Sequence, residues 1–272
     1  MMRALHQTLD DDPKLLVDPI APRLIDAEGE AIRGALADLA VLPPAIRSRF
    51  RSLFLVRNRY AEDCLAESIS HGMHQYVILG AGLDTFAYRQ PRWANSLRVF
   101  EVDHPITQQW QRGRLAAARI STPANVSWIP VDFENETLGG ALSKAAFDFT
   151  APAFFSLLGV SQYLSEVALD LTLQFVLSMP ATSEIVLTFV LPEDARPADE
   201  AALVAAFAVR SGEMGEPWVT QFLPEELLTK LRAMGFSNVF HLSPADAGLR
   251  YFRDRRDGLN TWVTEQMMKA TV

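Results

Sequence analysis

Short apolar runs recur along the chain and alternate with stretches of helical periodicity. The first run, Gln75–Leu79, ends at a pair of glycines, and a continuous run of this length is typical of a strand buried on both faces. Similar runs occupy residues 97–102, 126–131, 152–160 and 183–190, and helical stretches separate them at residues 105–119, 138–146 and 166–179. This alternation predicts an α/β fold with a doubly wound, mostly parallel sheet. Right-handed crossovers would bring the carboxyl ends of the strands to one edge, where ligands bind.

The segments around this core predict how the rest of the chain is organised. Residues 1–43 are expected to form an N-terminal helical segment that is interrupted by prolines, and a long helix follows at residues 45–70. After the core, a helix is expected at residues 224–234 and a further strand at residues 238–242. We therefore predict one domain over residues 1–272, with N-terminal helices at 1–72, a core at 73–190, a helical cap insertion at 191–222 and C-terminal helix and strand elements at 223–272.

Composition narrows the class of protein. The chain of 272 residues is 49% hydrophobic and carries a net charge of −8, which argues against a duplex nucleic acid as partner. It has one cysteine, Cys64, so no intrachain disulfide forms and a reducing compartment is favoured. Four aspartates lie in residues 1–20, where a signal peptide would need an apolar segment, and the densest apolar stretch, residues 151–160, is too short to span a bilayer. We expect a cytoplasmic protein with neither nucleic acid nor membrane as partner.

The turn Gly80-Ala81-Gly82 directly follows the first predicted strand. Glycines let the backbone turn sharply and approach a ligand, so the turn indicates a nucleotide-type ligand. The alternative is a tight strand-to-helix turn, in which Asp84 or Thr85 caps the next helix.

Acidic residues follow the next two predicted strands. Asp103 ends the second strand, where a carboxylate would hold a ribose diol by two hydrogen bonds. Asp132 and Phe133 end the third, offering a carboxylate to an adenine amine and an aromatic face to its ring. Each aspartate has helix capping as its alternative, and Pro105 after Asp103 is consistent with a helix start.

Asp84 distinguishes between two classes of ligand. A dinucleotide fingerprint needs a third small residue for close packing beside the pyrophosphate, and Thr85 and Phe86 stand there instead. The Asp84 carboxylate would repel a pyrophosphate, whereas it would attract the ammonium group of S-adenosylmethionine, whose sulfonium adds a second positive charge. The sequence therefore favours S-adenosylmethionine as cofactor.

Arg57 is a candidate partner for the carboxylate of this cofactor. On a helical wheel it falls at the centre of the apolar face of helix 45–70, where a cation needs an anionic partner. The alternative is an internal ion pair with Asp84 or Asp63. A further set of arginines on this helix is interpreted as a solvated face: Arg47, Arg49, Arg51 and Arg59.

These motifs together resemble a known family. The run from Gln75 to Arg89 closely resembles the signature of the leucine carboxyl methyltransferase family, which includes protein-phosphatase carboxyl methyltransferases and bacterial polyketide O-methyltransferases. The resemblance extends over roughly residues 45–260 and continues at residues 100–105, 130–133, 154–164, 215–218, 232–236 and 251–252.

The resemblance implies a Rossmann-like methyltransferase fold and S-adenosylmethionine as cofactor. It places Asp103 at the ribose, Asp132 and Phe133 around the adenine, Gly80 and Gly82 beside the methionine part, and Arg57 at its carboxylate. Two positions depart from the family pattern. Leu158 stands where some members have glutamate, which implies a donor contact that is missing or supplied elsewhere, and Phe86 stands where the family usually has arginine.

The expected reaction is methylation of a carboxylate or hydroxyl of a small molecule. Methyl transfer from a sulfonium requires alignment and desolvation, and only a hydroxyl acceptor needs a base. His104 or His241 could be that base, but an ordinary surface or capping role is preferred for both, and no metal-ligand spacing is present. We expect acceptor specificity in residues 191–222 and in the N-terminal helices. The alternatives are an NAD(P)-dependent oxidoreductase and a catalytically inactive S-adenosylmethionine-binding protein.

Overall fold

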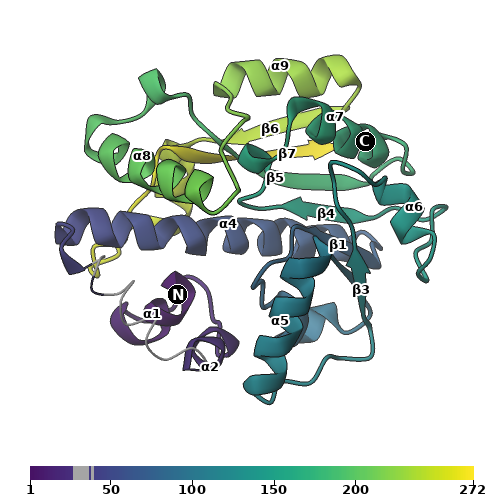
Figure 1. Cartoon of the computed structure of the whole chain (residues 1–272), viewed down its shortest axis with the longest axis horizontal. Helices are drawn as coiled ribbons and strands as arrows, with labels where there is room; N and C mark the ends of the chain where they lie inside the picture. The colour runs from purple at the N-terminus through teal and green to yellow at the C-terminus, as the bar shows by residue number, and fades with distance from the viewer. Residues whose placement is uncertain (27–36, 38–39) are drawn as a thin grey trace.

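A seven-stranded sheet forms the centre of the computed structural model, which describes residues 1–26, 37 and 40–272 (Figure 1). The strand order is β3-β2-β1-β4-β5-β7-β6. The strands are β1 (Gln75–Leu79), β2 (Arg98–Asp103), β3 (Val126–Pro130), β4 (Phe154–Leu157), β5 (Glu184–Val190), β6 (Asn238–Leu242) and β7 (Glu265–Thr271). Strands β1 to β5 are parallel, and β7 runs antiparallel between β5 and β6. The predicted doubly wound, mostly parallel sheet is confirmed.

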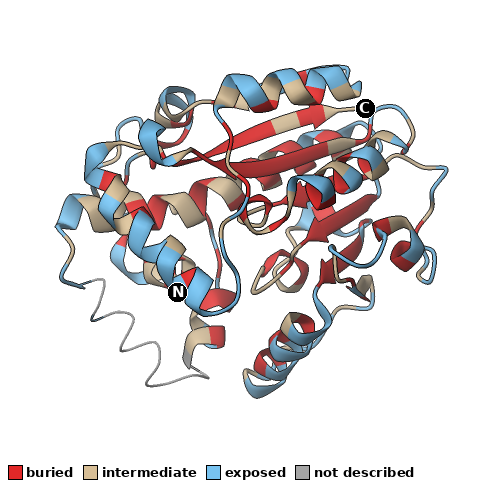
Figure 2. Ribbon diagram, turned by 45° about the horizontal axis from the view of Figure 1, so that its top comes forward, coloured by how far each residue is buried: buried red, intermediate tan, exposed pale blue. Residues whose placement is uncertain are grey.

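Helices cover both faces of this sheet, and successive residues of its central strands β1 and β4 are all buried. In β1, Val77 and Leu79 belong to a core shared with α6 (Leu138–Leu142), α7 (Glu166–Leu177) and α9 (Pro224–Met234). Their neighbours Tyr76 and Ile78 pack instead on the face covered by α4 (Pro44–Ser70) and α10 (Pro244–Ala247). Figure 2 shows the central strands as the buried layer between exposed outer helix faces. A strand buried on both sides explains why alternation of polar and apolar residues is absent from its sequence.

The remaining described elements are all helical. They are α1 (Met2–Leu9), α2 (Ile20–Asp26), α5 (Pro105–Ala117), α8 (Ala198–Glu213), a π-helix (Gly248–Phe252) and short 3-10 helices at Phe86–Tyr88, Arg92–Ala94, Ser161–Tyr163 and Glu193–Ala195. The predicted alanine-rich helix of the segment 191–222 is α8. Residues 27–36 and 38–39 of the predicted N-terminal helical segment lie outside the described residues.

Several boundaries differ from the sequence prediction. The apolar run at residues 152–160 pairs only over Phe154–Leu157, since Gly159 adopts a positive φ of 71° and turns the chain. The helix expected at residues 138–146 ends at Leu142. Strand β7 was not predicted, because its sequence, Glu-Gln-Met-Met-Lys-Ala-Thr, carries no strand pattern and the strand forms through pairing with β5 and β6.

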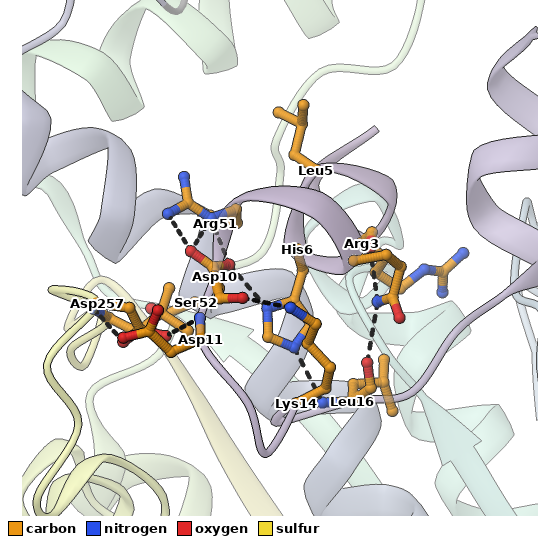
Figure 3. A network of polar contacts seen from close by, with 12 residues as sticks. Arg3, Leu5, His6, Asp10, Asp11, Lys14, Leu16, Arg51, Ser52 and Asp257 are labelled. Carbon is orange, nitrogen blue, oxygen red and sulfur yellow. Dashed lines mark hydrogen bonds and ion pairs between the residues drawn. The ribbon is translucent and has the colours of Figure 1, made fainter.

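A buried polar network fastens α1 to α4 (Figure 3). Asp10 accepts hydrogen bonds from Arg51 Nε at 2.8 Å and Nη2 at 2.6 Å, and it lies 2.7 Å from His6 Nδ1. The other ring nitrogen of His6 accepts from Leu16 N at 3.3 Å. The interpretation of Arg51 as part of a solvated face is therefore wrong: 8% of the residue is exposed, because α1 covers this side of α4.

The same interpretation is also wrong for Arg49 and incomplete for Arg59. Arg49 donates to Asp199 and Glu200 of α8, both at 2.8 Å. Arg59 donates to Asp63 at 2.7 Å, with 42% of its side chain exposed. The ion pairs of Arg49 and Arg51 show that α4 contacts α8 as well as α1, so this helix joins the N-terminal segment to the segment expected to form the cap.

Candidate active site

The chain turns sharply at the carboxyl end of β1. Gly80 and Gly82 have φ angles of 68° and 50°, a region that favours glycine. A Cβ on Gly80 would lie 2.4 Å from Val160 Cγ2, whereas one on Gly82 would meet nothing closer than 4.0 Å. Gly80 therefore permits close packing under Val160, and Gly82 leaves open space beside the backbone.

Asp103 at the end of β2 is bound to this turn. Its carboxylate accepts from Gly82 N at 2.5 Å and from His104 N at 2.7 Å. Burial raises the pKa of Asp103 above its ordinary value, although these two backbone donors oppose the shift. The structure thus places Asp103 next to the glycine turn at Gly82, two residues before Asp84 in the chain.

Asp84 organises the residues after the turn. It accepts from Phe86 N at 2.6 Å and from Asn58 Nδ2 of α4 at 2.8 Å, and Arg3 of α1 lies 3.9 Å away. Arg3 also donates to Leu83 O. A short 3-10 helix, Phe86–Tyr88, stands where the alternative of a capped helix was considered, and the buried Phe86 ring packs on Tyr76 at 5.1 Å.

A cavity of about 660 Å³ opens beside the turn, within the size range of small-molecule sites. On the sheet side it is lined by residues of the turn and of α4 and β7, including Arg57, Gly80, Ala81, Gly82, Asp84 and Glu265. The lining also has a largely apolar part, which includes Phe50 and Phe54 of α4 together with Phe207, Trp218 and Trp262. The cavity therefore joins a charged part to an aromatic part.

Arg57 reaches this cavity from the inward face of α4, as its helical position predicted. Its Nη1 donates to Glu265 Oε1 of β7 at 3.1 Å, and its guanidinium lies 4.7 Å from the centroid of the Phe54 ring. A Cβ on Gly159 would come within 2.4 Å of Arg57 Nη1, so this glycine makes room for the arginine. The ion pairs considered with Asp84 or Asp63 are wrong, and Glu265 was missed because it lies in the unpredicted strand β7.

Asp132 and Phe133 follow β3, two strands away from β1 in the sheet, and are outside the lining of this cavity. Asp132 accepts from Glu134 N at 3.1 Å and from Asn135 Nδ2 at 2.8 Å, and the Asn135 and Glu134 hydrogen bonds lower its pKa. Phe133 packs against the core beside α6 and α7. Asp132 therefore closes a local turn, whereas the helix-capping role considered for it belongs to Thr137 at the start of α6.

The two histidines considered as bases lie outside the cavity. His104 accepts from Ile106 N at 3.3 Å and so caps α5, and His241 Nε2 lies 2.7 Å from Gln266 Oε1. Both therefore have the ordinary roles that were preferred. Among the residues that the structure describes, no group of three or more His, Cys, Asp or Glu side chains is placed to hold a metal ion.

Comparison with known proteins identifies the class to which this site belongs. A family model for leucine carboxyl methyltransferases matches residues 1–177. A Bacillus subtilis protein with the provisional name S-adenosyl-L-methionine-dependent methyltransferase YktD is 36% identical over 79% of this chain and 71% of its own. A provisional S-adenosyl-L-methionine-dependent methyltransferase of Mycolicibacterium gilvum is 32% identical over 67% of this chain and 61% of its own. The chain thus spans about two thirds of the length of these curated relatives.

Two solved structures share the fold. A DUF574 family protein from Streptomyces avermitilis has a TM-score of 0.58 and 18% identity, covering 92% of this chain and 96% of its own. A protein from Thermobifida fusca, described provisionally as a methyltransferase, has a TM-score of 0.59 and 20% identity, covering 92% and 93%. At such identities the likeness concerns the fold alone.

These findings define an S-adenosylmethionine-dependent methyltransferase. The chain belongs to the leucine carboxyl methyltransferase family, as its motifs predicted, and S-adenosylmethionine is the cofactor. This assignment replaces the alternative of a nicotinamide-dependent oxidoreductase. No helix in the described part of the chain combines the length and apolarity needed to cross a membrane.

The residues of the cavity fit this cofactor. Arg57 Nε is buried without a hydrogen-bond partner among the described residues, so the guanidinium has a donor left for an anion. The carboxylates of Asp84 and Glu265 line the same cavity and suit an ammonium group. Leu158, which stands where some family members have glutamate, also lines the cavity. An acid is nevertheless present in this cavity, because Glu265 of β7 lines it as well.

Proposed function

We propose that this enzyme transfers a methyl group from S-adenosylmethionine to an oxygen, carboxylate or hydroxyl, of a small molecule. The observation that carries the proposal is the cavity itself, in which the glycine turn and its charged neighbours open onto an aromatic wall. S-adenosylmethionine supplies an electrophilic methyl group, and the chain has to hold both reactants in line and keep water away.

Each predicted site residue takes one part in this proposal. Arg57 binds the carboxylate of the cofactor, and Asp84 binds its ammonium group. Asp103 holds the ribose, while Asp132 and Phe133 flank the adenine at the end of β3. Glu265 supplies the acidic contact that Leu158 does not. Its ion pair with Arg57 holds the Glu265 carboxylate beside the proposed site of the cofactor carboxylate. The backbone of Gly80, Ala81 and Gly82 then lies beside the methionine part.

The lining favours an acceptor that needs no base. No histidine is among the described residues that line the cavity, and its two acids, Asp84 and Glu265, are engaged with Asn58 and Arg57. A carboxylate is nucleophilic without losing a proton, so among oxygen acceptors it is the first to test. We also propose a single domain with residues 191–222 as its cap, and a cytoplasmic location consistent with one cysteine.

A labelled-methyl assay tests this function. Purified protein is incubated with methyl-labelled S-adenosylmethionine and a panel of aromatic and aliphatic carboxylic acids, phenols and proteins. Methyl esters release labelled methanol in mild alkali, whereas ethers do not, so the chemistry of the product identifies the acceptor oxygen. We expect alkali-labile products from small acids.

Matched variants provide the control. Arg57→Gln removes the proposed carboxylate contact, and Arg59→Gln alters an arginine on the same helix whose side chain is 42% exposed. Calorimetry with S-adenosylhomocysteine should show weakened binding only for Arg57→Gln. Labelling of proteins but not of small molecules, or equal binding by both variants, would contradict the proposal.

A further inference from the structure

One face of α8 forms a wall of the cavity. The residues of this stripe recur at helical spacing and are Leu203, Val204, Phe207, Arg210, Ser211 and Met214. Phe207 stacks on Phe50 of α4, with ring centroids 4.9 Å apart and planes inclined by 22°. An apolar molecule of aromatic size is the natural occupant of such a wall.

The first turn of α8 is fixed in place by a buried carboxylate. Glu200 accepts from Val263 N at 3.1 Å, from Thr264 N at 2.9 Å and from Arg49 at 2.8 Å. Since these partners belong to the chain before β7 and to α4, the stripe is positioned by the elements that also carry Glu265 and Arg57.

Arg210 differs from the other charged residues of the cavity. Arg57 is paired with Glu265, and Arg3 contacts Asp18 at 3.3 Å and Asp84 at 3.9 Å. The Arg210 guanidinium has no ion pair or side-chain hydrogen bond with any described residue, although it lines the same cavity. Its planar fork suits an anion with two oxygens, such as a carboxylate or sulfonate.

The charges of the residues that line the cavity also favour an anionic ligand. The two paired arginines, Arg3 and Arg57, are matched in number by the lining acids Asp84 and Glu265, so Arg210 leaves one positive charge in excess. This local charge is notable in a chain whose net charge is −8. S-adenosylmethionine itself carries a net positive charge, so an anionic acceptor is attracted to the loaded cavity and a cationic one is repelled.

Two more polar groups at this side of the cavity lack partners within the described residues. Trp218 Nε1 and Gln162 Oε1 are both buried and unbonded, and the two residues lie on adjoining segments, since Val219 N donates to Gln162 O at 2.8 Å. Buried polar groups are paired in most proteins, so unpaired ones that line a cavity indicate a ligand with hydrogen-bonding groups of its own.

We propose that the methyl acceptor is an apolar molecule bearing an anionic group, and that Arg210 binds this group. The inference rests on the proposed function, because it treats the aromatic part of the cavity as the acceptor site. It adds a specificity-determining residue and a charge requirement for the acceptor.

A pair of fluorescent probes tests this directly. Anilinonaphthalene sulfonate and phenylnaphthylamine share an aromatic body, but only the first is anionic. Each probe is titrated into the full chain saturated with S-adenosylhomocysteine, for wild type, Arg210→Gln, Arg210→Lys, Phe207→Ala and Arg232→Gln. Arg232 is an exposed arginine of α9 outside the cavity lining and serves as the matched control.

We expect Arg210→Gln to weaken binding of the sulfonate probe by roughly two- to fivefold, the scale of an exposed ion pair, and to leave binding of the neutral probe unchanged. Arg210→Lys should keep part of the affinity, because it retains the charge but not the planar fork, and Arg232→Gln should keep all of it. Equal loss for both probes, no loss for the sulfonate, or unchanged binding of both probes to Phe207→Ala would overturn the inference. Calorimetry with S-adenosylhomocysteine alone keeps a failure of the proposed function distinguishable, because only that failure abolishes binding to the wild type.

Discussion

The buried ion pair between Asp10 and Arg51 allows a sharp prediction about α1. Side-chain exposure is 1% for Asp10 and 10% for Arg51, so Asp10→Asn would leave a buried cation without its anion. Breaking a buried pair in this way costs about 3–5 kcal/mol. An amide oxygen still accepts one hydrogen bond, which reduces the cost to roughly 2–4 kcal/mol.

This cost is about as large as the free energy that apolar burial contributes to holding α1 on the rest of the protein. The helix buries only Met2 and Ala4 among its apolar side chains, a contribution of about 2–4 kcal/mol at most. We therefore expect Asp10→Asn to detach α1 locally while the sheet keeps its stability. Detachment also withdraws Arg3 from Leu83 and Asp84 at the glycine turn.

Hydrogen exchange measured by peptide is the appropriate assay. Amides of α1 should lose protection in Asp10→Asn, whereas β1 and β4 should not, and S-adenosylhomocysteine should bind more weakly. The double variant Asp10→Asn with Arg51→Met removes the stranded charge and should recover part of the protection. Asp11→Asn, at the exposed neighbour, is the control. Wild-type protection of α1 in Asp10→Asn would refute the reasoning.

The ion pair between Asp10 and Arg51 also predicts how the attachment of α1 depends on pH. Burial alone would raise the pKa of Asp10, but the hydrogen bonds and charges of His6 and Arg51 outweigh it and hold the pKa below its ordinary value. The contribution to stability is therefore complete above the unfolded value of about 3.9 and is lost as the pH falls through the lower folded pKa. Protection of α1 should thus persist to about pH 4 and disappear in stronger acid.

Three further predictions concern the glycine turn and strand β2. Gly80→Ala combines a positive φ with a Cβ that would lie 2.4 Å from Val160, whereas Gly82→Ala has only the backbone strain of about 1–2 kcal/mol. Denaturant titration should therefore show a larger loss of stability for Gly80→Ala than for Gly82→Ala, and equal losses would contradict this. Because burial raises the pKa of Asp103, affinity for S-adenosylhomocysteine should fall as the pH is lowered toward that pKa, and Asp103→Asn should show a flatter profile by calorimetry. Burial raises the pKa of Glu101 to about 8, so the folded state loses stability as the pH rises from about 4.3 to 8, by up to about 1.4 kcal/mol per pH unit. Melting temperatures of Glu101→Gln should therefore depend less on pH over that range. An unchanged slope would show that Glu101 is not responsible.

The sequence predicted what depends on local pattern. Short, mostly apolar runs identify β1, β2 and β5, because a strand buried on both faces is rich in apolar residues. The helical wheel of α4 placed Arg57 toward the site, and the glycines marked the turn after β1. Each of these inferences uses residues close together in the chain.

Partners that are distant in the chain could not be predicted in this way. Glu265 pairs with Arg57 across 208 positions, and Arg51 pairs with Asp10 across 41, so no local pattern reveals either ion pair. Helical periodicity found the face of α4 toward the sheet, but it could not show that α1 covers another face. Similarly, Arg210 reads as one exposed charge on α8 until the cavity beside it is known.

The position of β7 has a consequence for the order in which the protein can be completed during synthesis. Residues 265–271 follow all other strands in the chain, yet they lie between β5 and β6 rather than at an edge. While these residues are still inside the ribosome, β5 has an open edge that can pair with other chains, and β6 has no neighbour in the sheet. Glu265 also has not yet reached Arg57, so the nascent chain has an unfinished cofactor site. Sheet closure and assembly of the site are therefore one late event, and a shortened chain that stops before residue 265 should aggregate rather than fold into a weaker enzyme.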